Sequence, residues 1–282
     1  MAREITLHFG EDGSGAFPEY KIGNSLIVGK TGSGKSVLLT NILAEFVLRY
    51  NQTDIIVDMF DGKGMEFVTG RGSTGIEFCE IAMRCVNYAE STIETFIETT
   101  YDMCEKRVKN LTDYECTDWN DYNERISGTG SGMRTEVVFI EEFDASIEKL
   151  PKCVVEELLN KLAFIMKNAH RTGLFIVISS HRVGFMDTYK CLQEHFDIVA
   201  CTRADEDASY ELFGSDVAAT QVGKFGKVCV RGRDKDVNIL NVPFYYKKNV
   251  INGIIHKTIL PKGVMFDDDK LAQFAKFIGS GL

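Results

Sequence analysis

The sequence lacks the features that would place the protein in a membrane, outside the cell or around a structural metal. No run of 18 apolar residues occurs among its 282 residues, so no transmembrane helix is expected. The N-terminus, MAREITLHFG, has acidic and polar residues and no apolar core, which is not typical of a signal peptide. The eight cysteines form no C-x-x-C pair and show no metal-ligand spacing. Cys85, Cys201 and Cys229 lie in apolar runs, which favours buried free thiols in a reduced, cytoplasmic protein.

An excess of positive charge is also missing. Lysine and arginine number 32 against 41 aspartates and glutamates, and the formal net charge is −9. This balance argues against a basic outer surface that grips nucleic acid. It is compatible with basic loops gathered at one place, such as the inner rim of a ring. Internal repeats and low-complexity tracts are absent as well.

The chain does contain an alternation of short apolar strands with amphipathic helices. Strands are expected at 3–9, 21–28, 54–59, 135–140, 174–179 and 196–201, with a hairpin at 227–231 and 237–242. Helices are expected at 36–50, at 76–110 (one or two), at 154–169 and near the C-terminus at 267–277. Residues 111–134 are polar, and their end, SGTGSGM, is expected to be a mobile loop. This alternation predicts an α/β fold with a mostly parallel central sheet flanked by helices.

The strongest motif is the segment SLIVGKTGSGKSV at residues 25–37. It fits G-x-x-x-x-G-K-[ST] between a buried strand and a helix, which is the context of a phosphate-binding P-loop. The backbone amides would surround the phosphates at the positive end of the helix dipole. Lys35 would reach the β- and γ-phosphates, and the Ser36 hydroxyl would hold Mg²⁺. The predicted nucleotide-binding residues are Gly29, Lys30, Thr31, Gly32, Ser33, Gly34, Lys35, Ser36 and Val37; a plain glycine turn is the alternative.

Two carboxylates follow the predicted strand at 135–140. Glu141 and Glu142 come directly after four apolar residues, at the end of a strand that we expect to neighbour the P-loop strand. Nucleotide hydrolysis needs a metal and a group that orients water, besides the phosphate cradle. We expect Glu141 to support Mg²⁺, usually through water, and Glu142 to polarise the attacking water. An acidic helix N-cap is the alternative.

Two further side chains suit the same chemistry. His181 follows the strand at 174–179, where it can touch the γ-phosphate and report its loss; the alternative is a loop histidine of no special role. Arg171 lies at the end of the preceding helix, where it can act as an arginine finger across a subunit boundary. The alternative for Arg171 is a cation favoured by the helix dipole.

Several blocks of the sequence together resemble the motor domain of the FtsK/SpoIIIE family, within the FtsK–HerA superfamily, over roughly residues 7–245. The blocks are FGEDGSG (9–15), IVGKTGSGKSV (27–37), VDMFDGKGMEF (57–67), MCEKR (103–107) with WNDYN (119–123), VVFIEEF (137–143) and VISSHRV (177–183). The chain departs from the family pattern at three positions. Glu141 replaces an aspartate, His181 replaces a glutamine, and the expected arginine position holds His170, with Arg171 one residue along.

The resemblance implies a RecA-like P-loop core that binds ATP and Mg²⁺ and hydrolyses ATP. It implies a homo-oligomeric ring, expected to be a hexamer, that translocates double-stranded DNA for a plasmid, a phage or another mobile element. A relaxase, a capsid or a membrane protein would be its partner. The alternatives are a related ATPase that drives protein secretion or switches a protein partner, and a non-motor nucleotide-binding module. The expected absence of membrane anchors favours DNA over secretion.

We expect the motor domain to occupy residues 1–245, and residues 246–282 to form a tail with a short helix packed on it. DNA contacts are expected from loops at the inner rim. Lys63 after the second predicted buried strand and Arg182 after the strand at 174–179 are the candidates. Solvated loop cations are the alternative for both.

Overall fold

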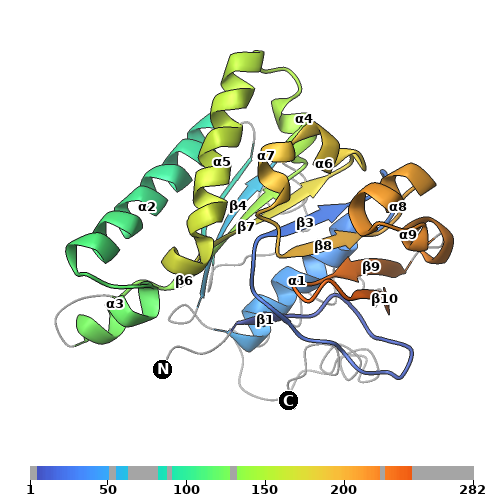
Figure 1. Ribbon diagram of the computed structural model, residues 1–282, viewed down its shortest axis with the longest axis horizontal. Coiled ribbons are helices and arrows are strands. Elements are labelled where there is room, and N and C mark those ends of the chain that lie inside the picture. Colours follow the sequence, from blue (N-terminus) through green and yellow to red (C-terminus); the bar gives the residue numbers. More distant parts are fainter. Residues whose placement is uncertain are drawn as a thin grey trace, which may run out of the picture.

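The computed structural model describes residues 5–50, 55–62, 82–87, 91–127, 132–222 and 226–242. In this part of the chain an eight-stranded sheet has the order β10-β9-β8-β3-β7-β6-β4-β5 (Figure 1). The strands are β3 (Ser25–Val28), β4 (Ile55–Asp61), β5 (Ala82–Asn87), β6 (Thr135–Glu141), β7 (Leu174–Ser180), β8 (Ile198–Cys201), β9 (Lys227–Arg231) and β10 (Val237–Asn241). Neighbours from β8 to β5 are parallel, whereas β9 is antiparallel to both β8 and β10. The predicted α/β class with a mostly parallel sheet is confirmed.

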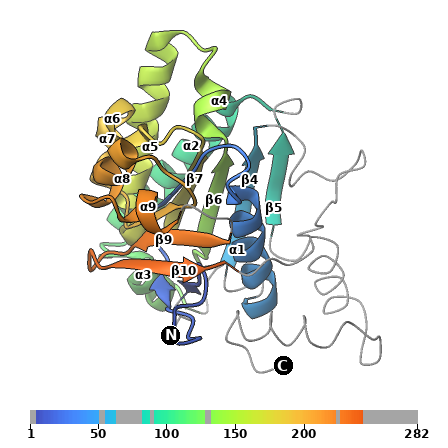
Figure 2. The ribbon, with the colours of Figure 1, turned by 90° about the vertical axis from the view of Figure 1, so that its right-hand side faces the viewer.

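Helices cover both faces of the sheet (Figure 2). One face packs against α1 (Lys35–Arg49) and the small antiparallel pair of β1 (Thr6–Leu7) and β2 (Tyr20–Lys21). The other packs against α2 (Ile93–Asp113) and α5 (Lys152–Thr172), which also contact each other. The shorter helices are α3 (Trp119–Arg125), α4 (Phe143–Ile147), α6 (Phe185–Thr188), α7 (Lys190–Gln193), α8 (Glu206–Phe213) and α9 (Val217–Gln221).

The central strands are continuous apolar runs because both faces of the sheet are covered. Along β6, Val137 and Phe139 pack on the α1 side, while Val138 and Ile140 pack on the side of α2 and α5. A strand buried on one face would alternate apolar and polar residues instead. Because of this two-sided burial, continuous apolar runs in the sequence marked the positions of β6 and β7. Within the described ranges, no helix has the length and apolar character needed to cross a bilayer.

The carboxyl ends of the parallel strands meet at one edge of the sheet, and the candidate functional loops leave from that edge. The glycine loop follows β3, Glu142 follows β6, and His181 follows β7. Ligands of open parallel sheets characteristically bind at this edge. The topology thus brings together residues such as Lys35 and His181, which lie 146 positions apart in the sequence.

Two expectations were wrong. The strand before Glu142 was expected to neighbour the P-loop strand, but β7 lies between β3 and β6. Residues 82–87 form the edge strand β5, parallel to β4, where a helix was expected over 76–110. Short apolar runs do not distinguish strand from helix, and pairing with β4 decides here. The helix starts only at Ile93, because the Thr92 side chain accepts the Thr95 amide as an N-cap.

Two polar segments for which no helix was predicted are helical. Residues 119–125 form α3, because Asp118 accepts the backbone N–H groups of Asn120 and Asp121. The charged stretch after β8 forms α8, with Asp205 as its N-cap. The predicted tail at 246–282, its helix and Lys63 lie outside the described residues.

Candidate active site

The glycine loop connects β3 to α1 in a conformation that depends on two of its glycines. Gly34 precedes the helix with φ 101°, a left-handed value that side chains other than glycine rarely adopt. A Cβ on Gly29 would meet the Thr202 hydroxyl at 2.1 Å and the Ser33 hydroxyl at 2.6 Å. The loop therefore packs closely against Thr202 at Gly29 and needs a left-handed backbone at Gly34. The sequence motif therefore adopts the strand, turn and helix that it predicts.

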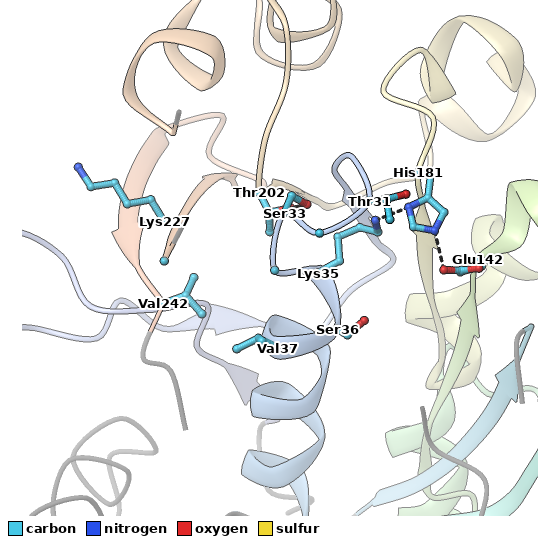
Figure 3. Close-up of a pocket in the computed structure, with 13 residues that line it drawn as sticks. Thr31, Ser33, Lys35, Ser36, Val37, Glu142, His181, Thr202, Lys227 and Val242 are labelled. Carbon is cyan, nitrogen blue, oxygen red and sulfur yellow. Dashed lines mark hydrogen bonds and ion pairs between the residues drawn. The ribbon is translucent and has the colours of Figure 1, made fainter. Parts of the chain in front are cut away.

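A cavity of about 650 Å³ opens beside this loop (Figure 3). Its size suits a nucleotide. The lining residues come from the glycine loop and the first turn of α1, from the ends of β6, β7, β8 and β10, and from the start of β9: Thr31, Gly32, Ser33, Gly34, Lys35, Ser36, Val37, Glu142, His181, Thr202, Gly226, Lys227 and Val242. Seven of the nine predicted nucleotide-binding residues line it, and Glu142 and His181 join them. Gly29 and Lys30 belong to the same loop but do not line this cavity.

A short chain of contacts joins the loop to the end of β6. Lys35 Nζ lies 2.6 Å from His181 Nδ1, and His181 Nε2 lies 2.5 Å from Glu142 Oε1. An ammonium group can only donate, so His181 Nδ1 is the acceptor and its Nε2–H donates to the carboxylate. Lys35 Nζ also donates to the Gly29 carbonyl at 2.6 Å. In Figure 3 dashed lines join Lys35 to the His181 ring and the ring to Glu142.

The backbone at Glu142 turns sharply out of the sheet. Its φ of 51° and ψ of 47° are in the left-handed region, which is costly for a residue with a Cβ. The Glu142 N–H donates to the Ser179 hydroxyl at 3.1 Å, which ties this turn to β7. The turn directs the Glu142 side chain into the cavity. Glu141 is still in β6, is 4% exposed and does not line the cavity.

The polar groups of the cavity fit a Mg²⁺ ion that arrives with a nucleotide. Mg²⁺ keeps several waters and takes one or two protein ligands besides phosphate oxygens. Ser36 lines the cavity from the first turn of α1, and its hydroxyl points toward the side where Glu142 lies (Figure 3). A hydroxyl and a nearby carboxylate are hard oxygen donors of the required kind. The metal role of Glu141 remains a prediction, and it would require an intervening water.

Sequence reasoning missed two residues that shape the site. Thr202 follows β8, lines the cavity, and its hydroxyl lies 2.6 Å from that of Ser33. The rule that located Glu142 and His181, a polar residue after a parallel strand, would have found it. Asp144 in α4 is 5% exposed and accepts the backbone N–H groups of His181 and Arg182. Nothing local in the sequence indicates that partnership, because 37 residues separate Asp144 from His181.

Arg171 is not brought to this cavity. It is exposed at the end of α5, just before Gly173, whose φ of 69° ends the helix. Since β7 begins at Leu174 and His181 follows its other end, Arg171 lies at the opposite edge of the sheet. Its predicted role as a finger is therefore possible only toward another subunit.

His170, the residue at the family's arginine position, is engaged with its own chain. Its Nε2 lies 3.0 Å from Asp197 Oδ2, and Arg233 Nε donates to Asp197 Oδ1 at 2.8 Å. Burial raises the pKa of Asp197, but the His170 hydrogen bond and the Arg233 charge outweigh it and leave the pKa below its usual value. His170 thus helps to hold the amino-terminal edge of the sheet together.

Of the two candidate DNA contacts, one can be placed. The Arg182 side chain is 46% exposed beside the cavity-lining His181 and forms an ion pair with Glu148, with Nη2 3.3 Å from Oε1. An exposed ion pair of this kind contributes little to stability, so the arginine is accessible to an anionic ligand. Lys63 lies outside the described residues.

The parallel sheet, the glycine loop and the convergent lysine and glutamate define a P-loop ATPase. The chain belongs to the FtsK/SpoIIIE family, whose family model matches residues 5–221. A search of curated protein sequences finds no match.

Solved structures with the same fold include ATPases of two kinds. The pCW3 conjugation coupling protein TcpA, with bound ATPγS, is 19% identical over 92% of this chain and 72% of its own, with a TM-score of 0.68. The cytoplasmic domain of the type VII secretion ATPase EccC from Thermomonospora curvata is 16% identical over 90% of this chain, with a TM-score of 0.70. EssC (ATPases 2 and 3) from Geobacillus thermodenitrificans is 17% identical over 93%, with a TM-score of 0.65. This chain spans only 31% of EccC and 51% of EssC.

Proposed function

We propose that this chain is an ATP-driven motor that assembles as a ring, a hexamer, and translocates double-stranded DNA for a plasmid, phage or other mobile element. The observation that supports it best is the contact chain Lys35–His181–Glu142 within an FtsK/SpoIIIE ATPase fold. It joins a phosphate-binding lysine to a carboxylate suited to activate water.

Each residue of the site has a defined task in this proposal. The amides of residues 31–36 and Lys35 bind the triphosphate. Glu142 orients and polarises the attacking water, and His181 lies between the phosphate end of the cavity and Glu142. Mg²⁺ would be held by Ser36, supported by Glu141 through water, and would neutralise charge on the β- and γ-phosphates. Gly29 shapes the loop, and Lys30 pairs with Asp205 at 3.0 Å beside it.

A ring is part of the proposal because one subunit does not supply an arginine to its own cavity from the predicted position. Arg171 lies at the opposite edge of the sheet and is exposed. In a ring it would reach the cavity of the neighbouring subunit and stabilise the charge that develops on the transferred phosphoryl group. The motor domain, residues 1–245, would act in the cytoplasm with a relaxase, a capsid or a membrane protein as its partner.

DNA is the proposed substrate because the chain covers most of TcpA, a conjugation coupling protein, and because Arg182 is accessible next to His181. A second candidate is a protein substrate. EccC and EssC have TM-scores in the same range, and EccC (ATPases 2 and 3) has been solved with a signal sequence peptide. Both candidates use the same ATPase site and differ in what stimulates it.

DNA stimulation of ATP hydrolysis is the decisive experiment. We expect double-stranded DNA to raise the ATPase rate, and electron microscopy with DNA and a non-hydrolysable ATP analogue to show rings around the duplex. Unchanged hydrolysis with DNA, together with stimulation by a secretion-signal peptide, would overturn the DNA assignment in favour of the second candidate.

A further inference from the structure

We infer that Asp144 is a positioning residue of the ATPase site, which holds His181 at its place between Lys35 and Glu142. This role rests on the proposed ATPase site, and it adds a residue that the motifs do not include. Asp144 does not line the cavity, so it acts through His181 rather than on the nucleotide.

The contacts of Asp144 account for the inference. Its Oδ1 accepts the His181 N–H at 3.3 Å, and its Oδ2 accepts the Arg182 N–H at 3.2 Å. Both oxygens of a carboxylate that is 5% exposed are thus used on two consecutive amides of one loop. A buried carboxylate is costly unless hydrogen bonds compensate, so this arrangement favours a single backbone position for residues 181 and 182.

The tie between the two strand ends is reciprocal. Asp144 comes two residues after Glu142 and binds the loop after β7, while Ser179 of β7 accepts the Glu142 N–H at 3.1 Å. The Ser180 hydroxyl accepts the Arg182 N–H at 3.0 Å and closes the loop on itself. Glu142 and His181 are therefore held relative to each other from both sides.

Tight placement matters because the His181 ring makes two short contacts at once. Its nitrogens lie 2.6 Å from Lys35 Nζ and 2.5 Å from Glu142 Oε1. A small shift of the backbone would break one contact or both. Misplacement of a catalytic group by about 1 Å can cost on the order of 10²-fold in rate.

The test compares Asp144→Asn with a matched control, Asp118→Asn. Asp118 also accepts two backbone N–H groups, at 2.9 and 3.1 Å, but it caps α3 away from the cavity. We expect D144N to lower kcat for ATP about 10-fold or more, with ATPγS binding unchanged. D118N should have wild-type kcat. Equal kcat losses in the two variants would overturn the inference, because they would indicate a loss of folding stability only.

A double-mutant cycle and NMR separate positioning from general structural support. In a His181→Ala background, D144N should lower kcat by less than about 2-fold, because the group that it positions is gone. A full additional loss there would contradict the inference. In isotope-labelled protein, the nitrogen signals of the His181 ring should report the Nε2–H tautomer in wild type and in D118N, and an averaged form in D144N; an unchanged D144N spectrum would overturn the inference.

Two features keep this test separate from the proposed function. All assays are performed without DNA, so the outcome does not depend on what the motor moves. Glu142→Gln is measured in parallel, and wild-type activity in that variant would reject the proposed site rather than the role of Asp144. If D144N does not fold, Asp144→Glu keeps the charge but displaces both oxygens by one methylene, and it undergoes the same cycle.

Discussion

The Nζ atom of Lys35 lies 2.6 Å from Nδ1 of His181, which links the glycine loop after β3 to the loop after β7. Because His181 also contacts Glu142, a single side chain connects the phosphate-binding lysine with the carboxylate proposed to activate water. We therefore expect a change at Lys35 to alter the surroundings of Glu142 through the ring of His181.

Lys35→Ala should abolish ATP binding or hydrolysis and leave the fold intact. Lys35 is 6% exposed and lines the cavity, so its removal takes away the charge that would meet the phosphates. Isothermal titration with ATPγS and a steady-state ATPase assay measure the loss, and circular dichroism checks the fold. Hydrolysis at the wild-type rate would contradict the phosphate-site assignment.

Glu142→Gln should bind ATP and hold it unhydrolysed, because only the activation of water is removed. A general base typically contributes 10²-fold or more to the rate, so kcat should fall at least about 10²-fold while ATP binding persists. Glu141→Gln is measured in parallel; Glu141 does not line the cavity and is proposed to support Mg²⁺ only through water, so this variant should not trap ATP. If Glu141→Gln traps ATP and Glu142→Gln does not, the assignment of the two glutamates is reversed.

Arg182→Ala should weaken DNA binding and reduce its salt dependence. Each phosphate contact that is lost should lower the slope of log K against log salt by about 0.9 for duplex DNA. Arg125→Ala is a matched control, because Arg125 is 49% exposed and similarly paired with a carboxylate, at 3.9 Å from Asp121, but lies on α3. Fluorescence anisotropy at several salt concentrations provides the measurement. A DNA affinity that does not depend on salt would count against inner-rim contacts altogether.

If Arg171 serves as a finger for a neighbouring subunit, Arg171→Ala should bind ATP normally. Its rate of ATP hydrolysis should fall by on the order of 10³-fold. Wild-type specific activity should rise with protein concentration and with DNA. Mixing is the sharper measurement. Lys35→Ala subunits, whose own sites are inactive, should restore hydrolysis to Arg171→Ala subunits.

The alternative role of Arg171 gives a different result in the same mixture. A helix-terminal cation would give a less stable protein whose ATPase activity does not respond to mixing. His170→Ala is the control, because His170 is hydrogen-bonded to Asp197 in its own chain. Recovery by mixing of His170→Ala, and not of Arg171→Ala, would move the finger to position 170.

Native-state alkylation should modify Cys153 and leave Cys104, Cys201 and Cys229 unmodified. Burial raises the pKa of the Cys104 thiol to about 11 and those of Cys201 and Cys229 to about 12. Because only the thiolate reacts, these three cysteines stay unreactive at any pH well below their pKa values. Cys153, in contrast, is exposed. Burial also raises the pKa of Cys191, which should react more slowly than Cys153. Mass spectrometry after iodoacetamide treatment at pH 8 and in denaturant checks this order.

The sequence by itself determined the phosphate loop and the parallel core. The glycine loop is local: its strand, its turn and its helix are consecutive, and the left-handed backbone at Gly34 is specified within the loop itself. Strands β6 and β7 were predictable because burial on both faces leaves continuous apolar runs. Glu142 and His181 were found by their positions after these strands, since parallel strand ends share one edge of a sheet.

The tertiary structure decided what depends on contacts between distant segments. Residues 82–87 are a strand only because β4 offers an edge, and local periodicity cannot show that. The choice between two adjacent glutamates rests on the left-handed backbone at Glu142, which turns one side chain into the cavity and leaves the other in β6. Asp144 and Thr202 join the site through partners 37 and 169 residues away. Hydrogen bonds over such separations leave no periodic trace in a sequence, because only the folded sheet brings their donors and acceptors together.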